Sequence, residues 1–224
     1  MLKLPDVNLF WLGHDGFRLE ASVLTVYIDP FKLSAAPKPA SVVLLTHEHF
    51  DHCSIEDLRK VVTPKTIIVC PNECLSAVSK LKPGDLIPIA PGAKKEVLGV
   101  TVQAVPAYNT NKYRDAATKT LFHPKQDEKV GYLVTVGMNT IYHAGDTDAI
   151  PEMQGISCDV ALLPVSGTYV MTPDEAAKAA AVLKPKLAVP MHYGAIVGTE
   201  ADAQKFKELA TKAGIRAEVL KKES

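Results

Sequence analysis

The chain has 224 residues, its 25 basic and 25 acidic side chains cancel, and 47% of its residues are hydrophobic. The balanced charge gives no argument for a nucleic-acid partner, and no apolar run is long enough to cross a membrane. This length suits one sizeable core, so we expect a single domain over residues 1–224. Four cysteines without the pattern of a disulfide framework, and an N-terminus without a signal peptide, favour a reducing cytoplasm.

The first half of the chain alternates short apolar or β-branched runs with turn signals. The turn Gly13-His14-Asp15-Gly16 separates the first two runs, which predicts an antiparallel meander. Ser54, followed by an acid three residues later, predicts the start of a helix. We expect strands over residues 7–12, 17–20, 23–29, 41–46, 66–70, 86–89, 95–98 and 100–105, and a helix over 72–80.

The second half alternates strands with helices. Thr172-Pro173-Asp174-Glu175 predicts a helix N-terminus, and residues 106–126 lack a hydrophobic period, which is typical of a lid or substrate wall. Two sheets packed face to face with helices outside would accommodate this order, so the fold class is expected to be α/β. The expected strands are 130–136, 140–143, 159–163, 186–190 and 216–220, and the expected helices are 172–183 and 199–213.

The run His47-Glu48-His49-Phe50-Asp51-His52 holds three of the seven histidines of the chain. Crowded imidazoles repel one another when protonated, whereas neutral rings that bind a divalent cation remove that penalty. The run directly follows the expected strand over residues 41–46, so one strand end would supply ligands for two adjacent metals. Asp146 and His192 each follow another buried strand beside a glycine, and they would complete such a site.

The string HEHFDH matches the HxHxDH signature of the metallo-β-lactamase-fold hydrolases, and the chain resembles this family from Gly13-His14 to His192. The resemblance implies a four-layer αβ/βα sandwich with its site at the edge between the sheets. It implies that His47 and His49 bind a first metal and that Asp51, His52 and His192 bind a second. Asp146 would bridge both ions. Zinc is the default metal for such ligands, although manganese or iron fits the same set.

One position departs from the family pattern. A third histidine for the first metal usually follows a strand such as 100–105, but the sequence there reads Pro106-Ala107-Tyr108-Asn109. His123, His14 and Asn109 are the possible substitutes, and we favour His123. His143 is expected to be a core or supporting residue, and Asp29 could orient a ligand histidine through its free ring nitrogen.

Two adjacent divalent ions would lower the pKa of a shared water, whose hydroxide would attack an electrophilic carbonyl or phosphoryl group. Asp51 and Asp146 would position that hydroxide, while Tyr193, His123 or His14 would supply a proton to the leaving group. Lys112, Arg114 and Lys125 could hold a phosphate or carboxylate of a small-molecule substrate.

The chain is similar to the branch that includes ascorbate-phosphate lactonases and N-acyl phosphatidylethanolamine phospholipase D. That resemblance implies a metal-dependent hydrolase acting on an ester, lactone or phosphodiester. An iron-dependent oxidoreductase on the same fold and a non-catalytic metal-binding protein are the alternatives. Neither a nucleic-acid partner nor a membrane partner is expected.

Overall fold

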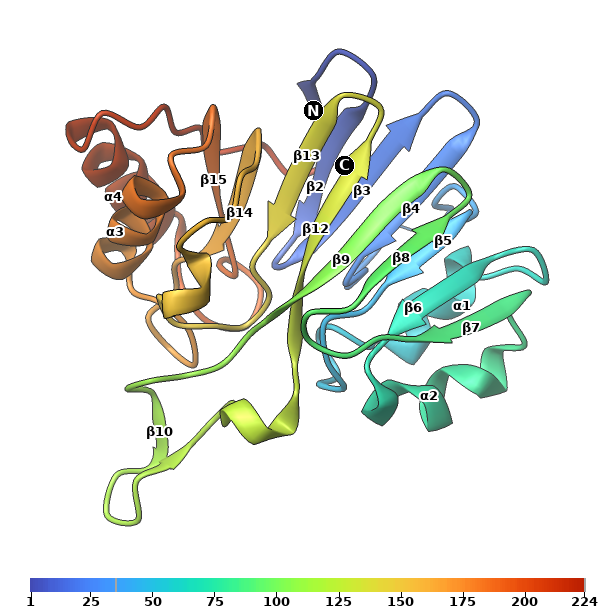
Figure 1. Ribbon diagram of the computed structural model, residues 1–224, viewed down its shortest axis with the longest axis horizontal. Helices are drawn as coiled ribbons and strands as arrows, with labels where there is room; N and C mark the ends of the chain where they lie inside the picture. The colour runs from blue at the N-terminus through green and yellow to red at the C-terminus, as the bar shows by residue number, and fades with distance from the viewer. Residues whose placement is uncertain (35, 224) are drawn as a thin grey trace.

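A computed structural model describes residues 1–34 and 36–223 of the chain. Two β-sheets face each other, and helices cover their outer faces (Figure 1). The first sheet runs in sequence order, antiparallel from β1 to β4 and parallel from β4 to β7. Its strands are β1 (Leu2–Lys3), β2 (Asn8–Gly13), β3 (Gly16–Ala21), β4 (Leu24–Ile28), β5 (Val42–Leu44), β6 (Ile67–Cys70) and β7 (Asp85–Pro88).

The second sheet has the order β15-β14-β13-β12-β9-β8. Its two parallel pairs, β13 with β14 and β14 with β15, bring three strand ends to one edge of the sheet. The strands are β8 (Lys94–Val97), β9 (Val100–Pro106), β12 (Val130–Val136), β13 (Asn139–His143), β14 (Val160–Pro164) and β15 (Leu187–Met191).

The burial pattern of β5 explains why the sheet has a layer on each side. Val42 and Leu44 belong to the core between the sheets, whereas Val43 and Leu45 belong to a second apolar cluster beneath α1 and α2. Alternate side chains of a strand point to opposite faces, so a fully apolar run indicates a sheet that is covered twice. The helices are α1 (Ile55–Val61) and α2 (Asn72–Val78) over the first sheet, and α3 (Pro173–Leu183) and α4 (Glu200–Lys212) over the second.

The expected layer order and fold class are therefore confirmed, as are the predicted helix starts. The Ser54 side chain accepts a hydrogen bond from the Asp57 amide, which caps α1. Thr172 and Glu175 form a reciprocal capping box with Pro173 in the first turn of α3.

The prediction of a strand over residues 216–220 is wrong. This segment meets the second sheet only through a single bridge between Ala188 and Ala217, and it then crosses to the first sheet. There the Glu223 amide donates to the carbonyl of Trp11, and the Glu223 carboxylate pairs with Arg18 at 2.6 Å. The C-terminal segment thus spans the two sheets instead of extending one of them.

The loop that joins β9 to β12, residues 107–129, is not wholly irregular. It contains a short hairpin of β10 (Tyr113–Asp115) and β11 (Thr120–Leu121), which projects away from the sheets (Figure 1). We refer to this connection as the 107–129 loop. No helix in the described part of the chain is long and apolar enough to cross a membrane, and all four cysteines are free.

Candidate metal centre

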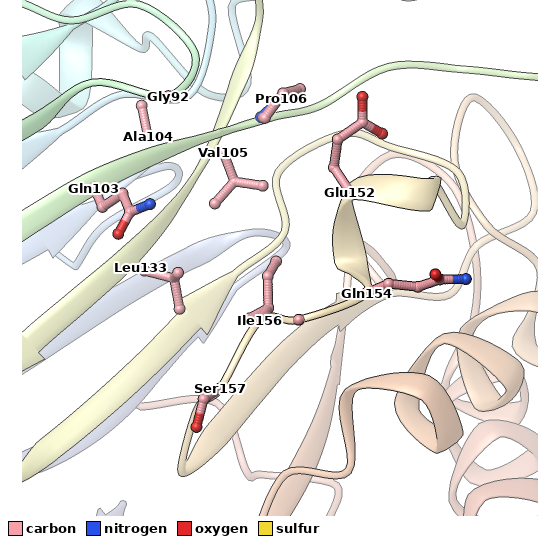
Figure 2. A pocket seen from close by; sticks show the side chains of 11 residues that line it. Gly92, Gln103, Ala104, Val105, Pro106, Leu133, Glu152, Gln154, Ile156 and Ser157 are labelled. Atoms are coloured by element: carbon pink, nitrogen blue, oxygen red, sulfur yellow. The ribbon is translucent and has the colours of Figure 1, made fainter.

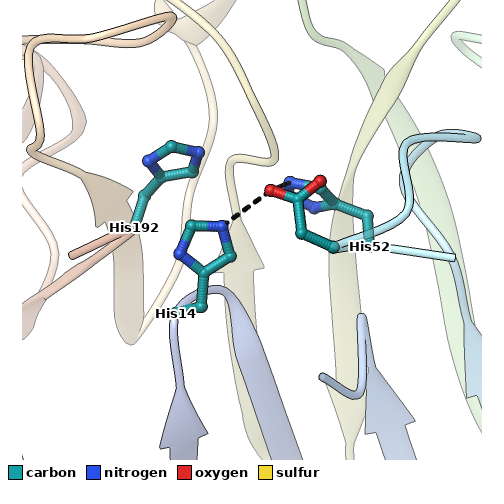
Figure 3. Close-up of side chains that lie close together, drawn as sticks. His14, His52 and His192 are labelled. Carbon is teal, nitrogen blue, oxygen red and sulfur yellow. Dashed lines mark hydrogen bonds and ion pairs between the residues drawn. The ribbon is translucent and has the colours of Figure 1, made fainter. Parts of the chain in front are cut away.

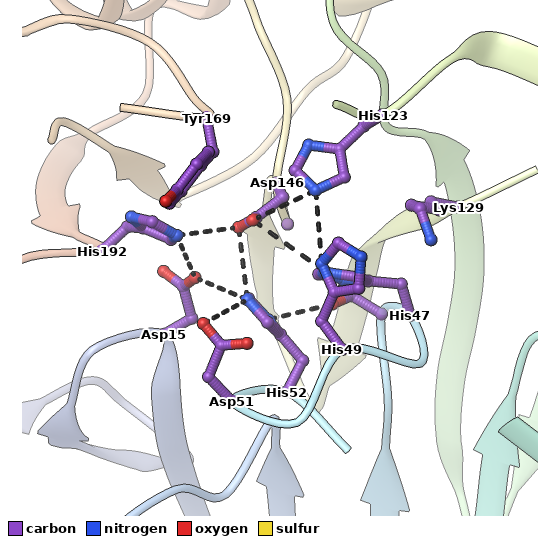
Figure 4. A network of polar contacts seen from close by, with 12 residues as sticks. Asp15, His47, His49, Asp51, His52, His123, Lys129, Asp146, Tyr169 and His192 are labelled. Carbon is purple, nitrogen blue, oxygen red and sulfur yellow. Dashed lines mark hydrogen bonds and ion pairs between the residues drawn. The ribbon is translucent and has the colours of Figure 1, made fainter. Parts of the chain in front are cut away.

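The candidate ligands gather where strands of both sheets end. His47 follows β5, Asp146 follows β13, and His192 follows β15 with a left-handed backbone (φ 60°). Gly145 also has positive φ, and a Cβ there would lie 2.7 Å from the carbonyl oxygen of Val130. Only glycine lets the chain pass this close to β12 and still direct Asp146 inward. Figure 4 shows the side chains converging from these separate elements.

The first cluster consists of His47, His49, His123 and Asp146, whose donor atoms lie within 4.8 Å of one another. His49 Nδ1 is 3.0 Å from His47 Nε2 and 3.5 Å from His123 Nε2. His123 Nε2 is also 3.6 Å from Asp146 Oδ2. The structure therefore brings His123, the favoured substitute for the missing histidine, to the two histidines of the strand-end run.

The second cluster comprises two overlapping groups of four residues. Asp146 Oδ1 lies 3.4 Å from both His52 Nε2 and His192 Nε2, and Asp51 Oδ2 lies 3.7 Å from His52 Nε2. All the ligands predicted for the second metal thus meet here. The complete cluster is His14, Asp15, Asp51, His52, Asp146 and His192.

His14 belongs to this second cluster and not to the first, so the structure does not support it as the third histidine of the first metal. Its Nε2 lies 2.9 Å from Asp51 Oδ2, and its ring packs 4.3 Å from the ring of His192 (Figure 3). Asn109 does not face either cluster. Its amide oxygen accepts from the His123 backbone, and its amide nitrogen donates to the carbonyl of Tyr169, so it fixes the 107–129 loop.

Supporting hydrogen bonds fix the orientation of the buried rings. Asp29 Oδ2 lies 2.7 Å from His52 Nδ1 and accepts from the Thr46 hydroxyl, which in turn lies 3.0 Å from His47 Nδ1. Ser166 Oγ lies 2.8 Å from His192 Nδ1. When Nδ1 is held from outside, Nε2 faces inward, which is the arrangement that metal-binding histidines require. Asp29 lies where a ligand-orienting residue was expected.

The electrostatics differ between the clusters. Burial lowers the pKa of His47 well below its usual value, and burial likewise lowers the pKa of His123 to about 4. Burial also opposes a charge on His192 and His52, but the surrounding carboxylates together outweigh it, with Asp146 the largest contributor. They raise the pKa of His192 to about 9 and that of His52 well above its usual value. The first cluster therefore offers neutral nitrogen lone pairs, whereas the second is a network of rings and carboxylates.

The donor set fits divalent cations. Among the described residues, His52 Nε2 and Asp146 Oδ1 are buried without a hydrogen-bond partner, although both face the interior of the second cluster. A tetrahedron of ligands at metal distances of about 2.0–2.1 Å has edges of about 3.3–3.4 Å. The spacings of 3.4 Å about Asp146 Oδ1 and of 3.5 and 3.6 Å about His123 Nε2 are close to that length. Cations would satisfy these otherwise orphaned atoms.

A cavity of about 260 Å³ opens onto both clusters. Among the described residues, no lysine or arginine lines this cavity, and Phe50 at its mouth is 67% exposed. Apart from the candidate metal ligands, the wall is apolar and aromatic. The lining residues are His49, Phe50, Asp51, Phe122, His123, Asp146, Tyr169 and Ile196.

The tyrosine on this cavity is Tyr169, which the sequence did not suggest. Its hydroxyl is directed toward the His192 side of the network (Figure 4). Tyr193, the residue proposed from sequence, is buried and stacks on Trp11 with ring centroids 4.7 Å apart. Because it does not line the cavity, Tyr193 is badly placed to donate a proton to a substrate there.

The cationic residues expected to hold a substrate phosphate lie away from the cavity. Lys112 pairs with Asp148 at 3.2 Å and with Glu175 at 2.9 Å, so it anchors the loop to α3. Lys125 pairs with Glu152 at 2.6 Å, and Arg114 is exposed on the projecting hairpin. None of the three lines the cavity at the clusters.

Two further features were not predicted. The buried Lys129 ammonium pairs with Glu48, the second residue of the histidine run, and lies 3.5 Å from Glu73 on α2. A lysine just before a strand gives no signal of this pairing in sequence. Asp15, between His14 and Gly16 in the first turn, enters the second cluster. Its place beside a glycine was the only sign of this role in the sequence.

A separate cavity of about 450 Å³ lies over the outer part of β9 and the segment around Gln154 (Figure 2). Glu152 is the only acidic or basic side chain that lines it, and none of the histidine clusters reaches it. It therefore offers no convergent set of catalytic groups.

Comparison with known proteins relates the sequence to one family. A family model described as a β-lactamase superfamily domain matches residues 8–192. A UPF0173 metal-dependent hydrolase of Methanopyrus kandleri is 32% identical and aligns over 96% of each chain, and one of Thermoplasma acidophilum is 32% identical over 94% of each.

Solved structures of similar proteins have the same fold. A candidate metal-dependent hydrolase from Parabacteroides distasonis superposes with a TM-score of 0.81 at 29% identity, over 97% of this chain and 94% of the other. Igni18, a metallo hydrolase from Ignicoccus hospitalis, gives a TM-score of 0.77 at 24% identity over 97% and 96%, which shows likeness of fold.

Proposed function

The chain belongs to the metallo-β-lactamase superfamily and, like its relatives, is a metal-dependent hydrolase. From that premise, we propose that it is a dinuclear enzyme acting on a small neutral ester or lactone. The observation that carries this proposal is the pair of buried donor clusters that share Asp146 at one cavity. His47, His49, His123 and Asp146 would hold the first ion, and Asp51, His52, Asp146 and His192 the second. The first set has three imidazoles and one carboxylate, and the second has two of each. Histidine with aspartate is a ligand combination typical of zinc, so we propose zinc, with manganese or iron as substitutes.

Divalent ions held there supply Lewis acidity for water activation and for the charge that develops on a substrate oxygen. The protein's own contribution is positional. His14 holds Asp51 by a 2.9 Å contact, and Asp29 and Ser166 hold His52 and His192 from outside the cluster. Tyr169, on the cavity wall, would donate a hydrogen bond or proton to the leaving group.

The lining of the cavity supports the choice of substrate. Phe50, Phe122 and Ile196 offer apolar contact to an acyl or aryl group. Lys112 and Lys125 of the 107–129 loop are paired with carboxylates, and Arg114 lies on the projecting hairpin and does not line the cavity. A phosphodiester would therefore lack a charged partner at the cavity. A neutral carbonyl substrate with an apolar substituent therefore fits better than a phosphorylated one.

The test is reconstitution of chelated protein with Zn²⁺, followed by elemental analysis and assays on matched panels of aryl and alkyl esters, lactones and phosphodiesters. We expect two zinc ions per chain and the highest kcat/KM for neutral, apolar carbonyl substrates. Absence of bound metal after reconstitution would overturn the proposal. Two retained ions without turnover on any panel would favour a metal-binding role, and oxygen consumption by iron-loaded protein would favour an oxidoreductase.

A further inference from the structure

We propose that Asp15 is an additional carboxylate ligand of the second metal, which makes that site richer in oxygen ligands than the predicted set of Asp51, His52, Asp146 and His192. This inference rests on the proposed dinuclear function. It concerns a residue in the turn between β2 and β3, far in sequence from the histidine run.

The turn holds the Asp15 backbone firmly. The Asp15 carbonyl oxygen lies 2.9 Å from Nε2 of the buried His143, and the carbonyl of His14 accepts from the Trp11 indole at 2.9 Å. A Cβ at Gly16 would lie 3.1 Å from the carbonyl oxygen of Gly13, so the turn is tight on its other side as well. The Asp15 side chain therefore has a fixed direction, and it enters the second cluster beside His192 (Figure 4).

The Asp15 carboxylate is fully buried, and neither of its oxygens has a hydrogen-bond partner among the described residues. Such a group is costly unless a cation or donor satisfies it. Its Oδ2 lies 3.5 Å from His52 Nε2 and 3.9 Å from His192 Nε2, and these atoms form a group within 4.8 Å together with Asp146.

Direct pairing with protonated histidines does not explain these distances. A charge-assisted N–H···O bond is about 2.7–2.9 Å long, as the 2.7 Å contact of Asp29 with the other side of the His52 ring illustrates. At 3.5 Å from the His52 ring and 3.9 Å from the His192 ring, Asp15 lies beyond that range for both. Its 3.5 Å spacing from His52 Nε2 is instead close to the edge of about 3.3–3.4 Å expected for ligands around one cation.

The consequence is an asymmetry in charge. Asp146 is the only carboxylate of the first cluster, whereas Asp15, Asp51 and Asp146 all reach the second. Three carboxylates would offset more of the charge of the second ion and would make that site more tolerant of manganese, for which carboxylate ligands are better suited than for zinc.

The test compares metal stoichiometry across variants, using Zn²⁺ alone as the probe. Chelated wild type, Asp15→Asn, His123→Ala, the double variant and Asp57→Asn are loaded with Zn²⁺, desalted and analysed for metal per chain. Asp57→Asn is the matched control, because Asp57 is likewise buried but contacts the amides of Lys32 and Leu33 and belongs to neither cluster. Near-ultraviolet circular dichroism verifies that each variant is folded.

We expect two ions in wild type and in Asp57→Asn, one in Asp15→Asn, one in His123→Ala and none in the double variant. The second zinc should bind Asp15→Asn at least about 100-fold more weakly, since loss of even an outer partner of a ligand costs about 10–100-fold in affinity. Two ions with unchanged affinity in Asp15→Asn would overturn the assignment of Asp15 and leave the proposed function standing. One ion retained in the double variant would assign Asp15 and His123 to the same ion and would also overturn it. Metal-free wild type would overturn both proposals.

Discussion

The two donor clusters meet at Asp146 but are built in different ways. Apart from Asp146, the second cluster comes from the β2–β3 turn, the segment after β5 and the end of β15, all packed against the core. The first cluster needs His123, which lies on the 107–129 loop. The lesson is that the same kind of ligand can be held by a rigid strand end or by a loop that itself has to be anchored.

The anchors of that loop are specific. The Asp148 carboxylate accepts from the amides of Thr110 and Asn111 at 2.6 and 3.0 Å, and Glu175 at the start of α3 binds Lys112. Asn109 bonds to the backbone of His123 itself. Perturbing these contacts should therefore affect the first cluster and spare the second.

The largest effect is expected from Asp146→Asn, which removes the carboxylate that both clusters share. Neither ion would be retained through desalting, and kcat/KM would fall by more than about 1,000-fold, since even an outer partner of a metal ligand contributes about 10–100-fold. Elemental analysis and hydrolysis of the preferred ester measure this. Retention of both ions at wild-type affinity would show that Asp146 does not bridge the clusters.

His123→Ala should disrupt only the first cluster, which depends on the 107–129 loop. We expect one zinc per chain and a loss of about 100-fold in kcat/KM, while the second ion stays bound. Tyr113→Ala is the control, because Tyr113 lies on the same loop but is exposed on the projecting hairpin. Two ions in His123→Ala would remove His123 from the ligand set.

His14→Gln tests the second cluster without deleting a proposed ligand. The side chain can still reach Asp51 with one donor, so both ions should remain and kcat/KM should fall by about tenfold, the lower limit for an outer partner of a ligand. Loss of one ion would instead identify His14 as a ligand. Metal content and steady-state kinetics at one pH distinguish these results.

The smallest effect is expected from Glu175→Gln, which weakens the loop anchor and the cap of α3. Burial opposes the charge of Glu175, but the Thr172 amide and Lys112 outweigh it and lower the pKa of this carboxyl from 4.5 to about 2. Its stabilisation is thus complete above pH 4.5 and is lost as the pH falls toward 2.

Chelated wild type should therefore be about 1 kcal/mol more stable than Glu175→Gln at pH 7, and this difference should vanish as the pH approaches 2. Urea unfolding at several pH values measures it. A difference that stays constant with pH would mean that the carboxylate charge does not contribute.

The ligands at strand ends could be predicted because each follows closely after an apolar run that predicts a buried strand. A run of β-branched residues followed by HEHFDH needs no knowledge of the rest of the fold, and Asp146 and His192 stand at comparable strand ends. The position of His123 could only be favoured among three candidates, since it depends on contacts of the loop with Asp148 and α3.

Other features lay outside what local sequence can show. Tyr169 reaches the cavity and Tyr193 does not, because the backbone takes a left-handed conformation at Tyr169 and the Tyr193 ring stacks on Trp11 of the other sheet. The pairing of Lys112 and Lys125 with carboxylates joins separate parts of the chain. The segment 216–220 has the pattern of a strand, but it leaves the second sheet after one bridge.

That C-terminal segment has a consequence for folding. The pair of Arg18 and Glu223 joins residues 205 positions apart, and it links the third strand of the chain to its last described residue. Contacts of such long range are formed late and slowly, because the entropy of closing the chain must be overcome first. On the ribosome, the outer edge of the first sheet near Trp11 would therefore be completed only after Lys222 and Glu223 had been synthesised.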